Sequence, residues 1–244
     1  MTNTITIEEA EHQIERYRIA LDEWLAAVYA EFDDRRYYGE MDAGYEKWGE
    51  IESVVGQVFD DRLTSQLSSQ SLDSLLFFIS RSDEIGCIIA WLYPETGSDL
   101  SAGDLTYDDF IFLCDQSLLR ADDYCDYQLV VCFQKLTALN EQDLALLKRY
   151  FDTKSDSYTR RMVLHAFAKF RLAETIPLAE RLWKTDASGF AKISCLYALE
   201  PFRDASGLLD QYLQEYELAF PAADADYRQT HLDHFRARKD DKRR

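Results

Sequence analysis

The chain has 244 residues, of which 47% are hydrophobic and 30% charged, so it can bury a substantial core and is not a disordered polymer. Only nine glycines and four prolines occur, which argues against turn-rich sandwiches and barrels and against glycine-dependent nucleotide folds, and favours helices. Forty-five acidic and 27 basic residues give a formal charge of -18, which argues against a DNA, RNA or anionic-lipid partner and favours a positively charged one.

The first residues and the apolar segments predict a cytoplasmic protein. The sequence MTNTITIEEAEH has neither a basic start nor an apolar signal core. The strongest apolar stretches, 75–79 and 85–93, are too short to cross a bilayer. The five cysteines form no C-x-x-C pair and lie mostly among apolar residues, which predicts buried thiols in a reducing compartment.

Residues 1–68 are predicted to form an N-terminal helical hairpin. Two apolar stripes at helical spacing run from Ile14 to Val28 and from Trp48 to Phe59, and the segment 33–44 between them breaks the periodicity. The serine-rich segment 63–74 is expected to be a loop that stays packed through its leucines. The hairpin is expected to pack on the repeats that follow.

Residues 69–238 are predicted to form helical repeats. Four segments, starting at Ile85, Leu129, Val163 and Cys195, carry apolar residues at i, i+3, i+4 and i+7, and their starts are 44, 34 and 32 residues apart. The intervening segments supply partner helices, and Asp123, Asp156 and Ser188 are predicted N-caps. The spacing predicts an all-α, right-handed α-solenoid of stacked antiparallel helix pairs, continuous with the hairpin in one domain.

The C-terminal part of the solenoid is expected to end in a capping helix and a tail. Tyr227, His231 and Phe235 give a thin apolar face, which suits a terminal helix that water covers on one side. The last six residues, 239–244, are basic and are predicted to be a disordered, solvated tail.

The segment SDSYTRRMVLHAFAKF, residues 155–170, resembles the second helix of HEAT-like repeats. That resemblance is carried by Asp156, Arg160, Arg161, Val163, Ala166 and Phe170. The segment ETIPLAERLW is similar to the matching first helix, with Pro177 in its opening turn, and 188–202 repeats the second-helix pattern less closely. The resemblance is good over 144–202 and loose from 72. It implies a helical-pair solenoid but no activity, because such repeats serve scaffolds, inhibitors and a few DNA-repair enzymes.

The sequence contains no residue set that identifies a reaction, so no enzyme, cofactor or metal is predicted. No H-E-x-x-H, G-x-S-x-G, P-loop or G-x-G-x-x-G occurs. Glu9 and His12 form a single E-x-x-H, whereas a di-iron site needs two. The pair His231 and His234, near Asp226 and Asp233, is spaced either for a divalent ion or for an exposed polar helix.

A group of basic residues between 160 and 192 is predicted to form a local ridge that pairs with nearby acids. The basic members are Arg160, Arg161, Lys169, Arg171, Arg181, Lys184 and Lys192, and the acids are Glu174, Glu180 and Asp186. His165 is expected to lie at a helix boundary rather than to act as a base.

Residues 95–126 carry nine acids against Arg120 alone, interleaved with tyrosines. Tyrosine gives broad contact area at low side-chain entropy, so the run is typical of a protein-binding patch, although a solvated acidic face that keeps the protein soluble also explains it. The predicted partner-binding residues are Asp104, Tyr107, Asp108, Asp109, Asp122, Asp123, Tyr124, Asp126 and Tyr127.

These features together predict a monomeric, non-catalytic protein that captures a basic protein partner. Its most concrete form is an immunity protein that neutralises a cationic toxin domain, since the chain resembles small acidic bacterial immunity proteins in character. A scaffold or assembly factor that binds peptides or subunits is the second hypothesis. A HEAT-like DNA-repair enzyme is the third hypothesis. The net negative charge disfavours it, because that charge suits neither a nucleic-acid partner nor a membrane.

Overall fold

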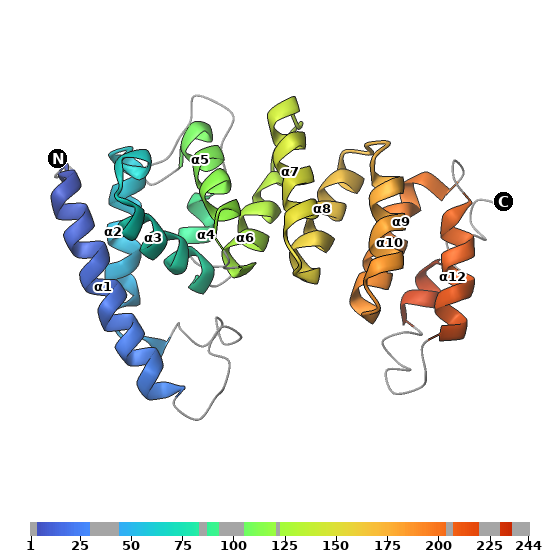
Figure 1. The fold of residues 1–244 in the computed structure, drawn as a ribbon, viewed down its shortest axis with the longest axis horizontal. Helices are drawn as coiled ribbons and strands as arrows, with labels where there is room; N and C mark the ends of the chain where they lie inside the picture. Colours follow the sequence, from blue (N-terminus) through green and yellow to red (C-terminus); the bar gives the residue numbers. More distant parts are fainter. Residues whose placement is uncertain are drawn as a thin grey trace. The chain divides into compact units, whose positions relative to one another are not determined.

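The structure is a computed structural model that describes residues 4–29, 44–82, 87–92, 105–120, 123–203, 207–219 and 230–235. These residues form helices, turns and connecting segments without a strand, which confirms the predicted all-α class (Figure 1). Within them, no helix combines the length and the apolar character that crossing a membrane requires. Residues 33–43 of the predicted breaker 33–44 and the basic tail 239–244 lie outside the described residues.

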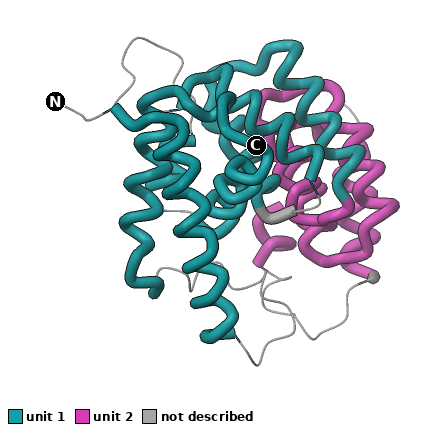
Figure 2. Tube along the Cα trace, turned by 60° about the vertical axis from the view of Figure 1, so that its left-hand side comes forward, with its two compact units in different colours: residues 1–154 teal, residues 155–244 magenta. Residues whose placement is uncertain are grey.

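The chain divides into two compact units, residues 1–154 and 155–244 (Figure 2). The boundary predicted at 68/69 falls inside unit 1. There α1 (Ile7–Val28) packs on both α2 (Trp48–Asp60) and α3 (Ser69–Arg81), so the N-terminal helices continue into the next helix without a break in packing.

Unit 1 continues through the short helix η3 (Thr64–Gln66), α4 (Cys87–Trp91), α5 (Tyr107–Leu118), α6 (Asp123–Phe133) and α7 (Glu141–Thr153). Helix α3 packs on α6, and α5 packs on both α6 and α7. The apolar stripes that predicted these helices are buried, among them Ile14, Leu21, Ile51 and Leu129, each at 0% exposure. Hydrophobic burial of these stripes stabilises unit 1.

The serine-rich segment is not the loop that its composition predicted. Leu63, Leu67 and Leu72 are buried as expected, but α3 begins at Ser69 inside the segment. The Ser68 hydroxyl accepts a hydrogen bond from the Ser71 N–H, which caps the helix. Serine therefore marks a helix start here, because its side chain satisfies a backbone donor that the first turn leaves free.

The apolar segment predicted to open the first repeat contains only the five-residue helix α4 in the described residues. Trp91 at its end lies over Gly56 of α2, where a Cβ atom would come within 3.2 Å of the Trp91 Cη2 atom. The glycine thus lets the indole approach the α2 backbone closely.

Unit 2 contains α8 (Ser157–Lys169), α9 (Thr175–Thr185), α10 (Gly189–Leu199), the short helix η4 (Glu200–Phe202), α12 (Leu208–Ala219) and a helical segment at 230–235. Helix α10 packs on α8, α9 and α12. Asp156 and Ser188 cap α8 and α10 as predicted, and Pro177 lies in the first turn of α9. Asp123, the third predicted cap, is instead the first residue of α6.

Two aromatic contacts fasten the C-terminal part of unit 2. The Trp183 ring of α9 stacks on the Tyr212 ring of α12, with centroids 4.1 Å apart and planes 3° apart. Tyr197 of α10 contacts Phe235, which is fully buried. Within unit 2, the segment 230–235 therefore packs on α10, as expected of a terminal helix.

Candidate functional site

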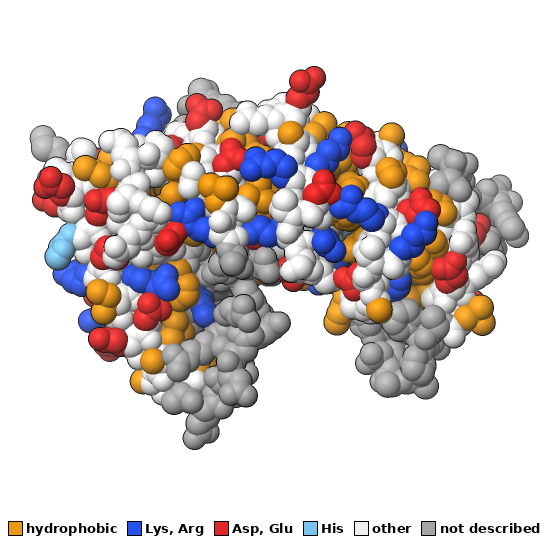
Figure 3. Space-filling model, viewed as in Figure 1, with side chains coloured by type: hydrophobic (Ala, Val, Ile, Leu, Met, Phe, Trp, Pro, Cys, Tyr) orange, Lys and Arg blue, Asp and Glu red, His pale blue; other side chains and the backbone are white. Residues whose placement is uncertain are grey.

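The two units differ sharply in charge. Residues 1–154 contain 31 acidic and 12 basic residues, a formal charge of -19, whereas residues 155–244 contain 14 acidic and 15 basic residues, a formal charge of +1. The excess of negative charge therefore belongs entirely to unit 1. Over unit 2, blue Lys and Arg side chains lie next to red Asp and Glu side chains on the face that Figure 3 shows.

Exposure follows the same division. Among the described residues of unit 1, 11 carboxylates are exposed against five basic side chains. In the described part of unit 2, three carboxylates and four basic side chains are exposed. The exposed carboxylates of unit 1 are Glu8, Glu9, Asp22, Glu23, Glu46, Glu50, Asp60, Asp73, Asp108, Glu141 and Asp152.

The predicted partner-binding run 104–127 is only partly at the surface. Asp104 and Asp122 lie outside the described residues, and the structure describes no side chain for Asp123 or Tyr124. Of the five residues whose side chains are described, only Asp108 is exposed.

Tyr107 is half-buried, and its hydroxyl joins two helices. It donates a hydrogen bond to Oδ1 of Asp143 at 2.6 Å and accepts one from Nδ2 of Asn140 at 2.7 Å. Burial, together with the hydrogen bond to Asp143, raises the pKa of Tyr107 to about 12. The hydroxyl therefore holds the start of α5 to the start of α7.

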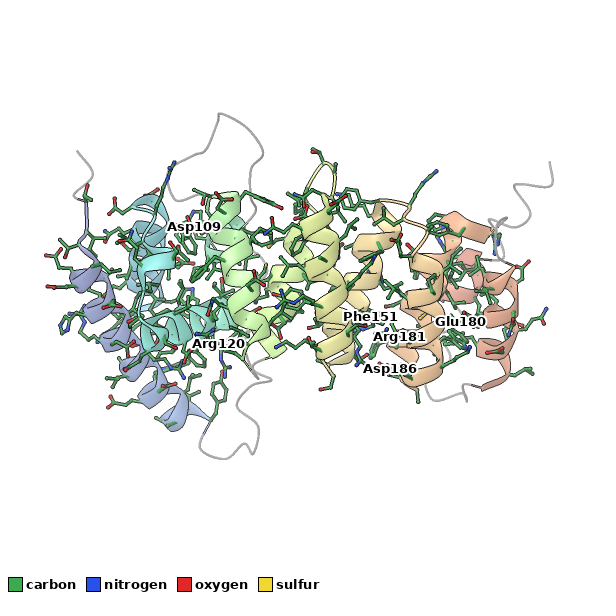
Figure 4. The ribbon with its side chains drawn as sticks, turned by 45° about the horizontal axis from the view of Figure 1, so that its top comes forward. Asp109, Arg120, Phe151, Glu180, Arg181 and Asp186 are labelled. Atoms are coloured by element: carbon green, nitrogen blue, oxygen red, sulfur yellow. The ribbon has the colours of Figure 1, made fainter. Side chains whose placement is uncertain are left out.

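Asp109 and Asp126 serve the fold, because both are buried. Asp109, at the start of α5 in Figure 4, accepts a hydrogen bond from the Thr106 hydroxyl at 2.7 Å, while Thr106 caps the helix. The Asp126 carboxylate, at 0% exposure, lies 2.6 Å from Nζ of Lys154. These two predicted binding residues are thus corrected to structural ones, since a partner cannot reach a buried carboxylate. Tyr127 is half-buried beside Gln128.

Several other carboxylates of unit 1 also hold segments of the fold together. Asp61 accepts a hydrogen bond from the Ile5 N–H at 2.8 Å, and Glu11 accepts one from the Ser68 N–H at 2.5 Å. Asp115 pairs with Arg149 at 2.5 Å. Backbone donors and arginines thus explain part of the acidic composition without any partner.

Three exposed glutamates gather where α1 meets α2. Glu50 accepts a hydrogen bond of 2.5 Å from the Tyr17 hydroxyl. Burial and the negative charges of Glu46, Glu50 and Glu23 raise the pKa of Tyr45, which reports a local excess of negative potential. We call Glu23, Glu46 and Glu50 the hairpin glutamates.

The predicted basic ridge of unit 2 is a set of local contacts. Lys184 pairs with Glu180 at 2.7 Å on α9, where Glu180 and Arg181 project beside Asp186 in Figure 4. Burial alone would raise the pKa of Asp186, but hydrogen bonds from Ser157 and Ser188, with the charge of Arg161, lower it.

One aromatic cluster in unit 2, exposed at Phe190, was not predicted from the sequence. The Arg161 guanidinium lies 4.6 Å from the Tyr158 ring centroid and 5.5 Å from that of Phe190, and Phe190 is 60% exposed. Tyr158 and Arg161 at i and i+3 were a signal in the sequence. Phe190 carried none, because α10 is apolar on most of its faces and gives no contrast between core and surface.

Glu9, His231 and His234, which the sequence offered as metal ligands, make other contacts, and Asp226 lies outside the described residues. Glu9 closes the capping box with Thr6, and the hydrogen bonds from Thr6 lower the pKa of Glu9. Nδ1 of His231 lies 2.8 Å from the Tyr197 hydroxyl, and His234 lies 3.7 Å from Glu200. In the described ranges, no three His, Cys, Asp or Glu side chains are placed to hold a metal ion together.

Comparison with known proteins gives no relative: no family model, no curated protein and no solved structure matches the chain.

Proposed function

We propose that this chain is a non-catalytic, cytoplasmic protein-binding module whose acidic unit captures a basic protein. The observation that carries the proposal is the division of charge, -19 in unit 1 and +1 in unit 2. Structural braces account for individual acids, yet 11 exposed carboxylates against five exposed bases remain at the described surface of unit 1. On this proposal, the helix pairs stack as a HEAT-like, right-handed solenoid, and this solenoid carries the exposed carboxylates of unit 1.

Electrostatic steering supplies the physical mechanism. A surface of one sign draws an oppositely charged partner by long-range attraction and raises the association rate at low salt. The hairpin glutamates are the best-placed contact for lysines and arginines in the described residues, because three carboxylates lie together there. Salt screens this attraction beyond about 10 Å at 0.1 M.

The test is affinity capture from extracts of the source cells with the full chain immobilised. The proposal expects one predominant basic protein, whose retention falls as salt rises. In the variant Glu23→Lys/Glu46→Lys its association rate at low salt falls about tenfold. The control variant Glu217→Lys/Asp233→Lys changes the charge by the same amount in unit 2 and is expected to bind normally.

Two results would count against the proposal. One is equal retention of the captured protein by all three chains; the other is retention that high salt leaves unchanged. Circular dichroism of each variant checks that the chain is folded, so that loss of capture reports the surface and not unfolding.

The most concrete version is an immunity protein that neutralises a cationic toxin domain. It predicts that the captured protein is a single toxin encoded beside this chain, and that deleting the gene for this chain kills the cell unless the toxin gene is deleted too. Several subunits of one assembly in the captured fraction would favour a scaffold instead.

A further inference from the structure

Tyr158, Arg161 and Phe190 form one surface where α8 and α10 begin. Tyr158 and Arg161 lie one turn apart on α8, His165 follows one turn later, and Phe190 is the second residue of α10. The two aromatic rings hold the Arg161 guanidinium through cation–π contacts. The arginine is therefore fixed in place before any ligand arrives.

Arg161 and His165 each leave a buried polar nitrogen unsatisfied. Nε of Arg161 and Nε2 of His165 are buried without a hydrogen-bond partner in the described structure. Neither nitrogen reaches the surface, so a partner can meet only the terminal amino groups of the half-buried Arg161 guanidinium. The positive charge of Arg161 acts on the Asp186 carboxylate, which also accepts hydrogen bonds from Ser157 and Ser188.

Phe190 adds a second, apolar requirement. At 60% exposure it is one of few large apolar side chains that the described surface leaves open to water, and covering it would remove apolar area from water. Aromatic and arginine side chains are the types most enriched at the energetic centres of protein interfaces.

We propose that this surface binds an aspartate or glutamate side chain of a polypeptide partner, with an apolar residue next to it that covers Phe190. The carboxylate accepts hydrogen bonds from the terminal amino groups of the Arg161 guanidinium, while Nε2 of His165 lies buried one turn beyond the arginine on the same helix. Burial lowers the pKa of His165 to about 4, which keeps the ring neutral at pH 7. A polypeptide fits better than a nucleic acid, because it can bring a single carboxylate beside an apolar side chain, whereas a nucleic acid brings one phosphate per nucleotide to a chain of charge -18.

This surface is separate from the hairpin glutamates, and the proposal does not depend on the capture of a basic protein. It is tested by selecting a random peptide library, displayed on phage, on the full immobilised chain. The peptides that emerge are then synthesised, and their affinities for purified variants are measured by titration calorimetry.

The expected peptides carry Asp or Glu beside an apolar residue. Their affinity falls at least about tenfold in Arg161→Gln and in Phe190→Ala, which corresponds to about 1.4 kcal/mol. Matched controls are Lys184→Gln, which removes a charge on α9, and Leu218→Ala, which removes an exposed apolar side chain on α12. Both controls and Glu23→Lys/Glu46→Lys are expected to bind normally.

Three outcomes would overturn the proposal. They are peptides without an acidic residue, peptides whose binding is the same in Arg161→Gln, and a single-stranded oligonucleotide that displaces the peptides and itself requires Arg161. The unfolding temperature of each variant is measured alongside, so that a misfolded variant is replaced by Arg161→Lys, which keeps the charge but loses the planar fork.

Discussion

Nζ of Lys154 lies 2.6 Å from Oδ2 of Asp126, and both side chains are almost entirely removed from water. The same ammonium donates hydrogen bonds to the carbonyl oxygens of Ser117 and Arg120, at 3.1 and 2.7 Å. One lysine therefore ties the end of α7 to α6 and to the end of α5. Its charge is compensated by the carboxylate and its protons by the carbonyls, as burial of an ion requires.

Replacing Lys154 with methionine is expected to destabilise unit 1 by about 3–5 kcal/mol, because the Asp126 carboxylate would stay buried without a counter-charge. Urea unfolding followed by circular dichroism measures the change. In the double variant Lys154→Met/Asp126→Leu, much of the stability is expected to return. A single variant that unfolds at the same urea concentration as the parent would contradict this role.

The Tyr107 hydroxyl is expected to act as a brace and not as a partner contact. Tyr107→Phe removes the donor to Asp143, which is buried, and should cost about 1–3 kcal/mol of unfolding free energy. Exposed Asp108 is the matched control, since Asp108→Asn should change stability by less than about 1 kcal/mol. Equal stabilities of the two variants would show that the hydroxyl is dispensable.

The same phenol gives a readout at high pH. Its folded pKa of about 12 lies above the ordinary value of 10, so it contributes stability below pH 10 that is lost as the pH rises toward 12. Tyrosinate absorbance during a pH titration should show the same number of tyrosines ionising near pH 10 in the parent and in Tyr107→Phe, and one more ionising near pH 12 in the parent. Ionisation of Tyr107 near pH 10 in the folded chain would contradict its burial beside Asp143.

His165 is expected to make unit 2 sensitive to mild acid. Its folded pKa of about 4 lies below the ordinary 6.5, first because of burial and second because of Arg161. Below pH 6.5 the unfolded chain therefore binds a proton at His165 that the folded chain does not bind. The free energy of unfolding is fully retained above pH 6.5 and is lower by about 2 kcal/mol at pH 5. His165→Gln should flatten the pH dependence of the unfolding free energy between pH 7 and 5. An unchanged slope would refute the assignment.

Trp183 is expected to fasten α9 to α12. Besides stacking on Tyr212, its indole N–H donates a hydrogen bond to Glu215 at 2.7 Å. Trp183→Phe should cost about 1–3 kcal/mol through loss of that bond and of ring area, and Tyr212→Ala about 3–5 kcal/mol. Leu218→Ala, on the same helix but exposed, should be neutral within about 0.5 kcal/mol. Thermal unfolding compares the three.

The sequence was enough to predict the all-α class and helices such as α8 and α10, because these depend on local features. Apolar residues three and four apart identified the buried stripe of α8, and the short polar side chains of Asp156 and Ser188 identified helix starts. The prediction of a loop for the serine-rich segment 63–74 was wrong for an equally local reason. Serine favours both turns and caps, and only the leucines that follow distinguish the two.

The predicted acidic site could not be resolved from sequence, because burial of a carboxylate depends on partners far along the chain. Asp143 is 36 residues from Tyr107, and no periodicity links the two. The apolar pattern of α6 is weak, so it fits Asp126 equally well at the surface or in the core. The buried position of Asp126 depends on its ion pair with Lys154, at the end of α7. The spacing of residues along one helix therefore predicts neither the contact of Tyr107 with Asp143 nor that of Asp126 with Lys154.

The uneven charge of the two units has a consequence for the free protein. Like charges repel, so an excess of 19 negative charges within residues 1–154 opposes the compaction of that unit, whereas the nearly neutral remainder feels no such strain. Added salt or a bound polycation screens the repulsion and tightens the first unit while leaving the second almost unaltered. Ionic strength is therefore expected to change the stability of unit 1 more than that of unit 2.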